Sequence, residues 1–212
     1  MLTTGLPLSS TNKTEIIDVI NEKTCSYMAN FPVEIFVVVG ANLQGNPVIC
    51  GGSSVTNVFS EKCYRFIISD GWREFASMKE KRVYAAGIMY RNELHVFGGI
   101  GDGAILQSSE IISEDSGVRD GPDLPTAVWN HAITAVNGTV SILSGGATYV
   151  DNFSSQSWYY NHETEIFTSG PTLLEGKRGH TSATIVDKFT KDKIPVVIGG
   201  YNGNVIDSTE LL

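Results

Sequence analysis

Short apolar runs that end in a pair of glycines recur along the chain at nearly constant spacing. The runs read "NPVICGG", "ELHVFGG", "TVSILSGG" and "IPVVIGG", and they end in Gly51–Gly52, Gly98–Gly99, Gly145–Gly146 and Gly199–Gly200. The second glycines of these pairs are 47, 47 and 54 residues apart, and a degenerate copy, "LTTG", ends 47 residues earlier at Gly5. A fixed period of this size predicts a repeat architecture.

Each repeat unit carries the pattern of four consecutive β-strands. Two runs dense in Val, Ile, Ala and Gly flank a short turn such as Gln44-Gly45-Asn46 or Asn137-Gly138. Asn-Gly suits a tight hairpin because both residues tolerate positive φ. A third and a fourth run follow, with clearer alternation of polar and apolar residues. The first two strands are therefore predicted to be buried on both faces, and the last two to lie nearer solvent.

A single sheet of this kind cannot bury both of its faces, whereas sheets stacked around an axis can. The sequence therefore predicts an all-β fold, a β-propeller of four-stranded antiparallel blades with about five repeats, the first and last of them partial. We expect one domain over residues 1–212, with a partial blade at 1–32, blades at about 33–80, 81–126 and 127–175, and a partial blade at 176–212. The glycine pairs would end the second strands where neighbouring backbones pack too closely for a Cβ atom.

The repeat units resemble those of the kelch-repeat β-propeller family over essentially the whole chain. The resemblance is carried by the glycine pairs, by the aromatic pairs Tyr64/Trp72 and Tyr159/Phe167, and by the segments "KRVY" and "GKRGH". The first unit departs most, because it lacks the double glycine and has Cys25 where the family often has tryptophan. Kelch propellers commonly have six or seven blades, so the chain is expected to be part of a longer propeller or a divergent five-bladed one.

Composition and charge limit the partners that such a protein could bind. The net charge is −8 and the acidic residues are scattered, so the chain repels phosphate backbones and nucleic acid is not expected as a partner. No apolar run approaches the roughly 20 residues that span a bilayer, so no membrane span is expected. Unpaired strand edges at both ends of the array are expected to favour self-association.

Two of the three cysteines fall on strands that are neighbours in one blade. Cys50 ends a second strand and Cys63 starts the third, so their Cα atoms could lie within disulfide range. Two buried thiols, each packed as a small apolar residue, are the alternative. Both readings remain open on the sequence alone.

Three N-glycosylation sequons begin at Asn12, Asn137 and Asn152. Together with a disulfide, they favour an extracellular or secretory location. The alternative is a cytoplasmic one, because "MLTTGLPLSS" lacks the basic and long apolar regions of a signal peptide.

The sequence contains no motif of an established enzyme class, and neither a metal site nor a cofactor is expected. The four histidines show no metal-ligand spacing. His131 and His180 occupy equivalent repeat positions, with Tyr84 as the counterpart in another unit, which indicates a packing role. No catalytic residue is therefore assigned.

Loops between strands and between blades are the remaining candidates for function, because rigid scaffolds display binding residues on loops. The candidate binding residues are Arg82, Tyr84, Trp129, Asn130, Tyr149, Arg178 and Tyr201. Arginine and aromatic residues anchor protein interfaces, although Arg82, Arg178 and Trp129 could instead lock adjacent blades together. The leading hypothesis is a non-enzymatic module that binds a protein partner. The alternatives are an extracellular carbohydrate-binding or galactose-oxidase-like propeller and, by the kelch resemblance, the substrate-recognition part of a ubiquitin-ligase adaptor.

Overall fold

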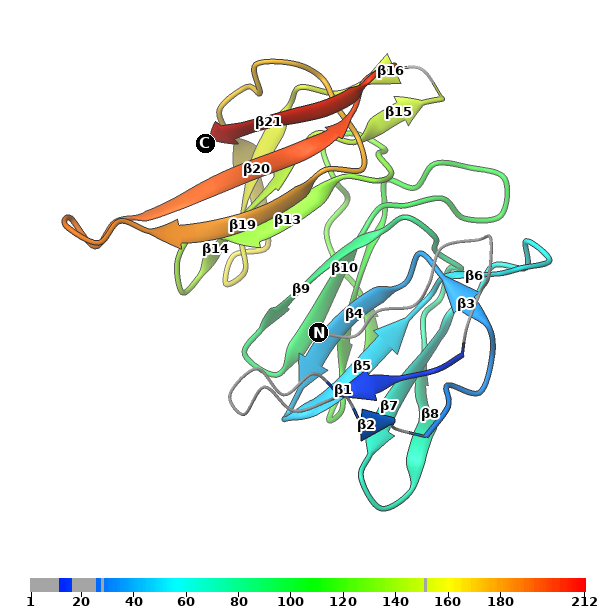
Figure 1. The fold of residues 1–212 in the computed structure, drawn as a ribbon. Helices are drawn as coiled ribbons and strands as arrows, with labels where there is room; N and C mark the ends of the chain where they lie inside the picture. Colours follow the sequence, from blue (N-terminus) through cyan, green and yellow to red (C-terminus); the bar gives the residue numbers. More distant parts are fainter. Residues whose placement is uncertain (1–11, 17–25, 28, 151) are drawn as a thin grey trace.

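The computed structural model describes residues 12–16, 26–27, 29–150 and 152–212, and every regular element in this part of the chain is a β-strand. It contains four large antiparallel sheets (Figure 1). Blade 1 comprises β4 (Val39–Leu43), β5 (Asn46–Cys50), β7 (Lys62–Ile67) and β8 (Gly71–Ser77). Blade 2 comprises β9 (Ala86–Tyr90), β10 (Glu93–Phe97), β11 (Ser109–Ser113) and β12 (Gly117–Asp120). Blade 3 comprises β13 (Ala132–Ala135), β14 (Val140–Ser144), β17 (Ser157–Asn161) and β18 (Ile166–Ser169), and blade 4 comprises β19 (Thr181–Val186), β20 (Lys193–Tyr201) and β21 (Val205–Leu211).

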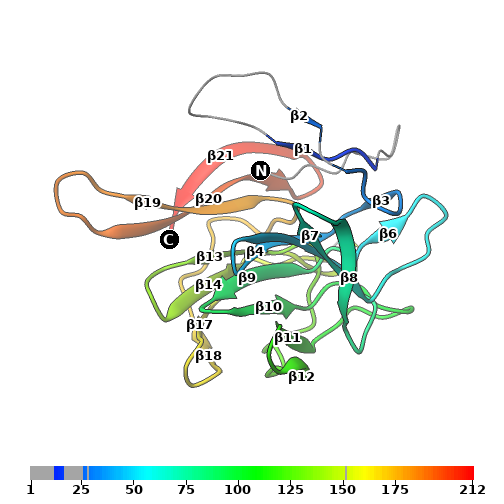
Figure 2. The ribbon, with the colours of Figure 1, turned by 90° about the horizontal axis from the view of Figure 1, so that it is seen from below.

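The blades are arranged like those of a propeller. Strands β4, β9, β13 and β19 are the first strands of their blades, and β9 contacts both β4 and β13 while β13 also contacts β19. Figure 2 shows β9, β10, β11 and β12 following one another outward from this centre. The prediction of an all-β fold with antiparallel blades around an axis is thus confirmed. Because the described residues contain no helix, they include none that could cross a bilayer.

Three small two-stranded sheets accompany the blades. They are β1 (Glu15–Ile16) with β2 (Ser26–Tyr27), β3 (Ile35–Phe36) with β6 (Ser53–Ser54), and β15 (Ala147–Tyr149) with β16 (Asn152–Phe153). The first belongs to the unit predicted at residues 1–32, most of which, with Gly5 and Cys25, lies outside the described residues.

The glycine pairs connect each blade to the next one. The amide of Gly99 donates a hydrogen bond of 2.9 Å to the carbonyl of Val128, which precedes blade 3. A Cβ atom on Gly99, whose φ is +95°, would lie 2.6 Å from the carbonyl oxygen of Val83, and one on Gly98 would lie 2.5 Å from that of Val128. Such contacts with backbone exclude any side chain. Equivalent inter-blade hydrogen bonds run from Gly52 to Arg82 and from Gly146 to Lys177.

The hairpin turns at residues 44–45 and 137–138 have different backbone conformations. Gln44 and Gly45 both have positive φ, at 51° and 83°, as a two-residue hairpin turn requires. Asn137 and Gly138 do form the predicted turn between β13 and β14, but neither residue has the positive φ that was expected there. Instead the side-chain Oδ1 of Asn137 accepts hydrogen bonds from the amides of Thr139 (2.9 Å) and Val140 (2.8 Å). An asparagine side chain can shape a turn in this way without left-handed backbone.

Cys50 and Cys63 form a disulfide, which resolves the choice left open by the sequence. The two residues are direct partners across β5 and β7, with their Cα atoms 4.1 Å apart. Both are almost fully buried and pack among Val39, Met78 and Val96, between blades 1 and 2. The disulfide therefore links β5 to β7 within the apolar cluster that joins blade 1 to blade 2.

Replacing both Cys50 and Cys63 with alanine is expected to lower the free energy of unfolding by about 3 kcal/mol, because the unfolded chain gains the freedom of a short loop. Urea unfolding with and without a thiol reductant measures the effect. Reductant should destabilise the wild-type protein by a comparable amount and leave the double variant unchanged. A wild-type protein insensitive to full reduction would contradict the expectation.

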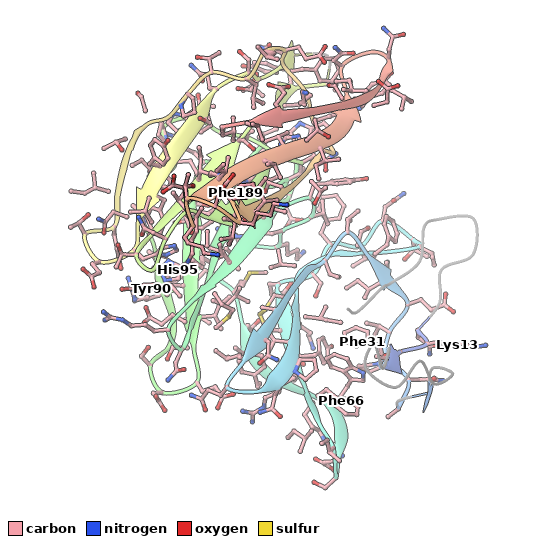
Figure 3. The ribbon with its side chains drawn as sticks, turned by 60° about the vertical axis from the view of Figure 1, so that its left-hand side comes forward. Lys13, Phe31, Phe66, Tyr90, His95 and Phe189 are labelled. Carbon is pink, nitrogen blue, oxygen red and sulfur yellow. A yellow bond between two sulfur atoms is a disulfide. The ribbon has the colours of Figure 1, made fainter. Side chains whose placement is uncertain are left out.

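The outer face of blade 1 is covered by the segment that precedes it. Phe31 contacts the ring of Trp72 edge-on, with 5.0 Å between ring centroids, and the Trp72 indole donates a 3.3 Å hydrogen bond to Thr14. Ile35 and Phe66 belong to the same cluster, and Figure 3 labels Phe31 and Phe66. This face of blade 1 is therefore protected from solvent by residues of the described N-terminal segments.

Candidate functional site

A residue with left-handed backbone precedes the first strand of every blade. These residues are Val37, Tyr84, Asn130 and Gly179, with φ of 52°, 55°, 57° and 63°. The amide of Asn130 donates to the carbonyl of Tyr84 (2.8 Å), and that of Gly179 donates to the carbonyl of Asn130 (2.9 Å). Since the first strands surround the axis, this chain of hydrogen bonds brings blades 2, 3 and 4 together at one end of it.

The preceding residue in each blade is also held by backbone pairing. Trp129 pairs with Ala147, and Arg178 pairs with Tyr201, each through two reciprocal hydrogen bonds of 2.9–3.1 Å. Ala147 and Tyr201 directly follow the glycine pairs of blades 3 and 4. The loop after each second strand therefore fixes the position of the segment that enters the first strand of the same blade.

A surface pocket of about 390 Å³ opens beside these residues. We call it the axis pocket, and it is lined by Tyr84, Trp129, Asn130, Arg178, Gly179 and Tyr201. Five of these six residues are among the candidates named from the sequence. The structure thus gathers residues from three blades, 117 positions apart between Tyr84 and Tyr201, into one concave surface.

Arg178 lies at the centre of the aromatic residues of the axis pocket. Its guanidinium carbon is 4.4 Å from the centroid of Trp129 and 5.7 Å from the centroids of Phe153 and Tyr201. Trp129 in turn contacts Tyr84 edge-on, with 5.3 Å between ring centroids. Such cation–π contacts hold the guanidinium in place without neutralising its charge.

Arg82 does not line the axis pocket. Its side chain is 1% exposed, and its guanidinium forms ion pairs with Glu110 at 3.1 Å and Glu80 at 2.9 Å. It also donates to the carbonyls of Gly98 and Ser108, both at 3.0 Å. These side-chain contacts join the segment that enters blade 2 to residues of the same blade, which is a structural role within blade 2.

Tyr149 lies on the same loop face as the axis pocket but outside its lining. It ends β15, two residues beyond Ala147, and its side chain is 72% exposed. No described residue forms a hydrogen bond or ring contact with it. Tyr149 is therefore an exposed aromatic residue at the rim.

Phe153 and Gly179 are not among the residues predicted from the sequence. Phe153 contacts Arg178 beside the axis pocket, because β16 pairs with β15 and places Phe153 opposite Ala147. Gly179 suits its left-handed backbone, and a Cβ atom there would lie 3.3 Å from the side-chain Nδ2 of Asn130. A signal for Gly179 existed, because it aligns with Tyr84 and Asn130 when the units are compared.

The same alignment corrects the assignment of the histidine positions. His131 and His180 directly follow the left-handed residues Asn130 and Gly179, so their counterpart in blade 2 is Ala85 and not Tyr84. Both imidazole rings lie against glycine pairs, His131 beside Gly98 and His180 beside Gly145. The packing role expected for these histidines fits this position, because each ring lies between two blades.

The other two histidines lie between blades 2 and 3. His95 Nδ1 is 3.2 Å from the Tyr160 hydroxyl, and His162 Nε2 is 2.8 Å from the Ser141 hydroxyl. Tyr90 stacks on His162 with 4.6 Å between ring centroids, and Figure 3 shows Tyr90 beside His95. Burial lowers the pKa of both His95 and His162 to about 4, so these rings are neutral at pH 7. No group of three metal-ligating side chains occurs within the described ranges.

Two further pockets open on the loop face. One of about 590 Å³ lies between the segment entering blade 2 and residues 101–106, and one of about 380 Å³ lies beside β6. Of the sequons, Asn137 and Asn152 are exposed and Asn12 is partly buried.

Comparisons with known proteins support the fold and leave the function open. No family model matches the sequence, and no curated protein matches it. A solved structure described as "Structure of YjhT" superposes with a TM-score of 0.75 over 94% of this chain and 88% of that chain, at 10% sequence identity. At this identity the likeness concerns the fold alone, and by its fold this chain is similar to YjhT.

Proposed function

We propose that this chain is a non-enzymatic, kelch-type interaction module that binds a protein partner through its loop face. The observation that carries the proposal is the axis pocket, where residues from three blades converge on a fixed arginine surrounded by aromatic rings. Interface hot spots are enriched in Trp, Tyr and Arg. The lining offers hydrogen-bond donors and apolar surface, which suit binding, and it contains no carboxylate, imidazole or thiol that could act as a general base.

A sugar-binding site is less well supported by the same geometry. Sugars stack on a free aromatic face, whereas Trp129 is 9% exposed and has the Arg178 guanidinium over its ring. The disulfide supports an oxidising compartment, extracellular or secretory, and disfavours a cytosolic ubiquitin-ligase adaptor. We therefore place the proposed partner among proteins of that compartment.

The test replaces Tyr84 and Tyr201 together with alanine. Candidate partners are first identified with a photo-crosslinking amino acid at Tyr201, which is 41% exposed, and the affinity of the purified partner is then measured. The double variant is expected to bind at least about tenfold more weakly, as loss of hot-spot aromatics implies.

The matched control replaces residues in the hairpin turns at the far ends of two first strands, β9 of blade 2 and β13 of blade 3. Asn92 lies in the turn between β9 and β10, and Gly138 lies in the turn between β13 and β14, where a Cβ atom would meet no atom within 4 Å. A variant carrying Asn92→Ala and Gly138→Ala should bind like the wild type. Equal affinity of the Tyr84/Tyr201 variant, with an unchanged melting temperature, would contradict the proposal.

A further inference from the structure

Arg178 differs from every other arginine of the chain in its ionic partners. All six arginines are described, and five of them form an ion pair: Arg65 with Glu114, Arg73 with Asp70, Arg82 with Glu110, Arg91 with Glu163 and Arg119 with Glu165. No carboxylate of a described residue lies within ion-pair distance of Arg178. In a chain with eight more acidic than basic residues, this guanidinium remains available for an external anion.

No described residue accepts a hydrogen bond from the Arg178 guanidinium, so its donors are available to a ligand. The guanidinium carbon lies over the Trp129 ring, and the N–H donors of a guanidinium lie within the plane of the group. That planar fork matches a carboxylate in a bidentate pair. Backbone pairing with Tyr201 fixes Arg178 before any ligand arrives, so little further ordering is needed on binding.

A monoanion fits the surroundings better than a phosphate or sulfate group. The nearest basic residue in the sequence, Lys177, is fully buried and is neutralised by Glu210, with Glu175 at 3.8 Å. Phosphate sites usually combine several basic groups, whereas the axis pocket contains one. The net charge of −8 also repels a dianion more than a monoanion.

From these observations we infer that the axis pocket binds a carboxylate, presented by an acidic side chain of the protein partner and paired with Arg178. The Asn130 amide and the Tyr84 and Tyr201 rings line the same pocket and would contact the remainder of the bound segment. This inference rests on the proposed function, because it names the group by which the partner is recognised.

The experiment titrates the intact chain with a matched pair of small probes, N-acetylglutamate N-methylamide and its neutral glutamine analogue. Nuclear magnetic resonance follows the side-chain Nε–H of Arg178 and the indole N–H of Trp129. The glutamate probe should produce saturable shifts at both groups, with an apparent affinity at least about fivefold higher than that of the glutamine probe. Glucuronate forms a third arm, and tighter binding of this sugar acid than of the glutamate probe would overturn the assignment to a protein partner.

Arg178→Gln is expected to abolish the saturable shifts at Trp129, and Arg178→Lys should retain weaker ones. The matched control is Arg91→Gln, because Arg91 also lies over an aromatic ring, that of Tyr90 at 5.0 Å, yet is already paired with Glu163. The control should titrate like the wild type. Shifts that persist in Arg178→Gln, or equal binding of both probes, would overturn the inference.

The inference and the proposed function can fail separately. A partner whose affinity falls in the Tyr84/Tyr201 variant but not in Arg178→Gln would leave the interaction module standing and remove the carboxylate site. Probe binding at Arg178 with an unchanged partner affinity in both variants would retain the carboxylate site and remove the proposed docking face.

Discussion

Replacing Arg82 with methionine is expected to destabilise the protein by roughly 3–5 kcal/mol, because the change leaves a buried carboxylate without its counter-ion. Glu110 is 2% exposed, and Arg82 contacts it through both Nε and an Nη atom, at 3.2 and 3.1 Å. The substitution also removes the donors to the carbonyls of Gly98 and Ser108. Chemical denaturation of the wild type and the variant measures the loss.

Blade 3 shows which apolar residues can replace the buried Arg82–Glu110 ion pair of blade 2. Val128 and Trp158 occupy in blade 3 the positions that Arg82 and Glu110 occupy in blade 2. A double variant, Arg82→Val with Glu110→Leu, should therefore be more stable than Arg82→Met, since no buried charge remains unpaired. Arg178→Gln, at a partly exposed position, should change stability by less than about 1 kcal/mol. An Arg82→Met protein as stable as the wild type would contradict the structural role.

Acidification is expected to destabilise the folded protein steeply between pH 6.5 and pH 4. Burial lowers the pKa of His95, His162 and His180 to about 4 and that of His131 to about 3. In the unfolded chain these groups titrate near 6.5, so in this range the unfolded state binds protons that the folded state does not. Stability is therefore complete above pH 6.5 and falls as pH drops toward the folded pKa values, by up to about 1.4 kcal/mol per pH unit for each histidine.

Thermal melting across this pH range measures the effect, and a single-histidine variant tests its origin. Neither ring nitrogen of His131 has a hydrogen-bond partner among the described residues, so His131→Leu removes a titrating group without breaking a described bond. This variant should show a shallower pH dependence than the wild type and a similar stability at pH 7. An unchanged slope would show that His131 does not take up the proton.

The position of all four histidines explains why acid should act on the contacts between blades. His95 and His162 face each other between blades 2 and 3, with Arg119 and Glu93 nearby. His131 and His180 lie against the glycine pairs that connect successive blades. Protonation would place charge on buried rings at the inter-blade contacts, beside Arg119, Glu93 and Glu165 for His95 and beside Lys177 and Glu210 for His180.

Much of the candidate site could be predicted because its residues occupy repeat positions. Tyr84 and Asn130 occupy equivalent positions, each just before the first apolar strand of its unit. The loops that follow the glycine pairs can be located from the spacing of those pairs along the sequence. The sequence could not show that Arg82 and Arg178 have different roles, since each belongs to a similar "KR" segment. The two arginines are offset by one position relative to the left-handed residue that follows, so Arg82 is buried within its blade and Arg178 lines the axis pocket.

By itself, the sequence determines the number and order of the strands in each blade, because alternation, turn residues and the glycine pairs act over short stretches of chain. The sequence also places Cys50 and Cys63 on adjacent strands of one blade. Only the tertiary structure decides that Cys50 and Cys63 are bonded and that Phe153 folds back onto Arg178. It also decides that five arginines pair with carboxylates, while Arg178 pairs with none of the described ones. These outcomes depend on which residues meet across blades, and such contacts are set by the packing of segments far apart in the chain.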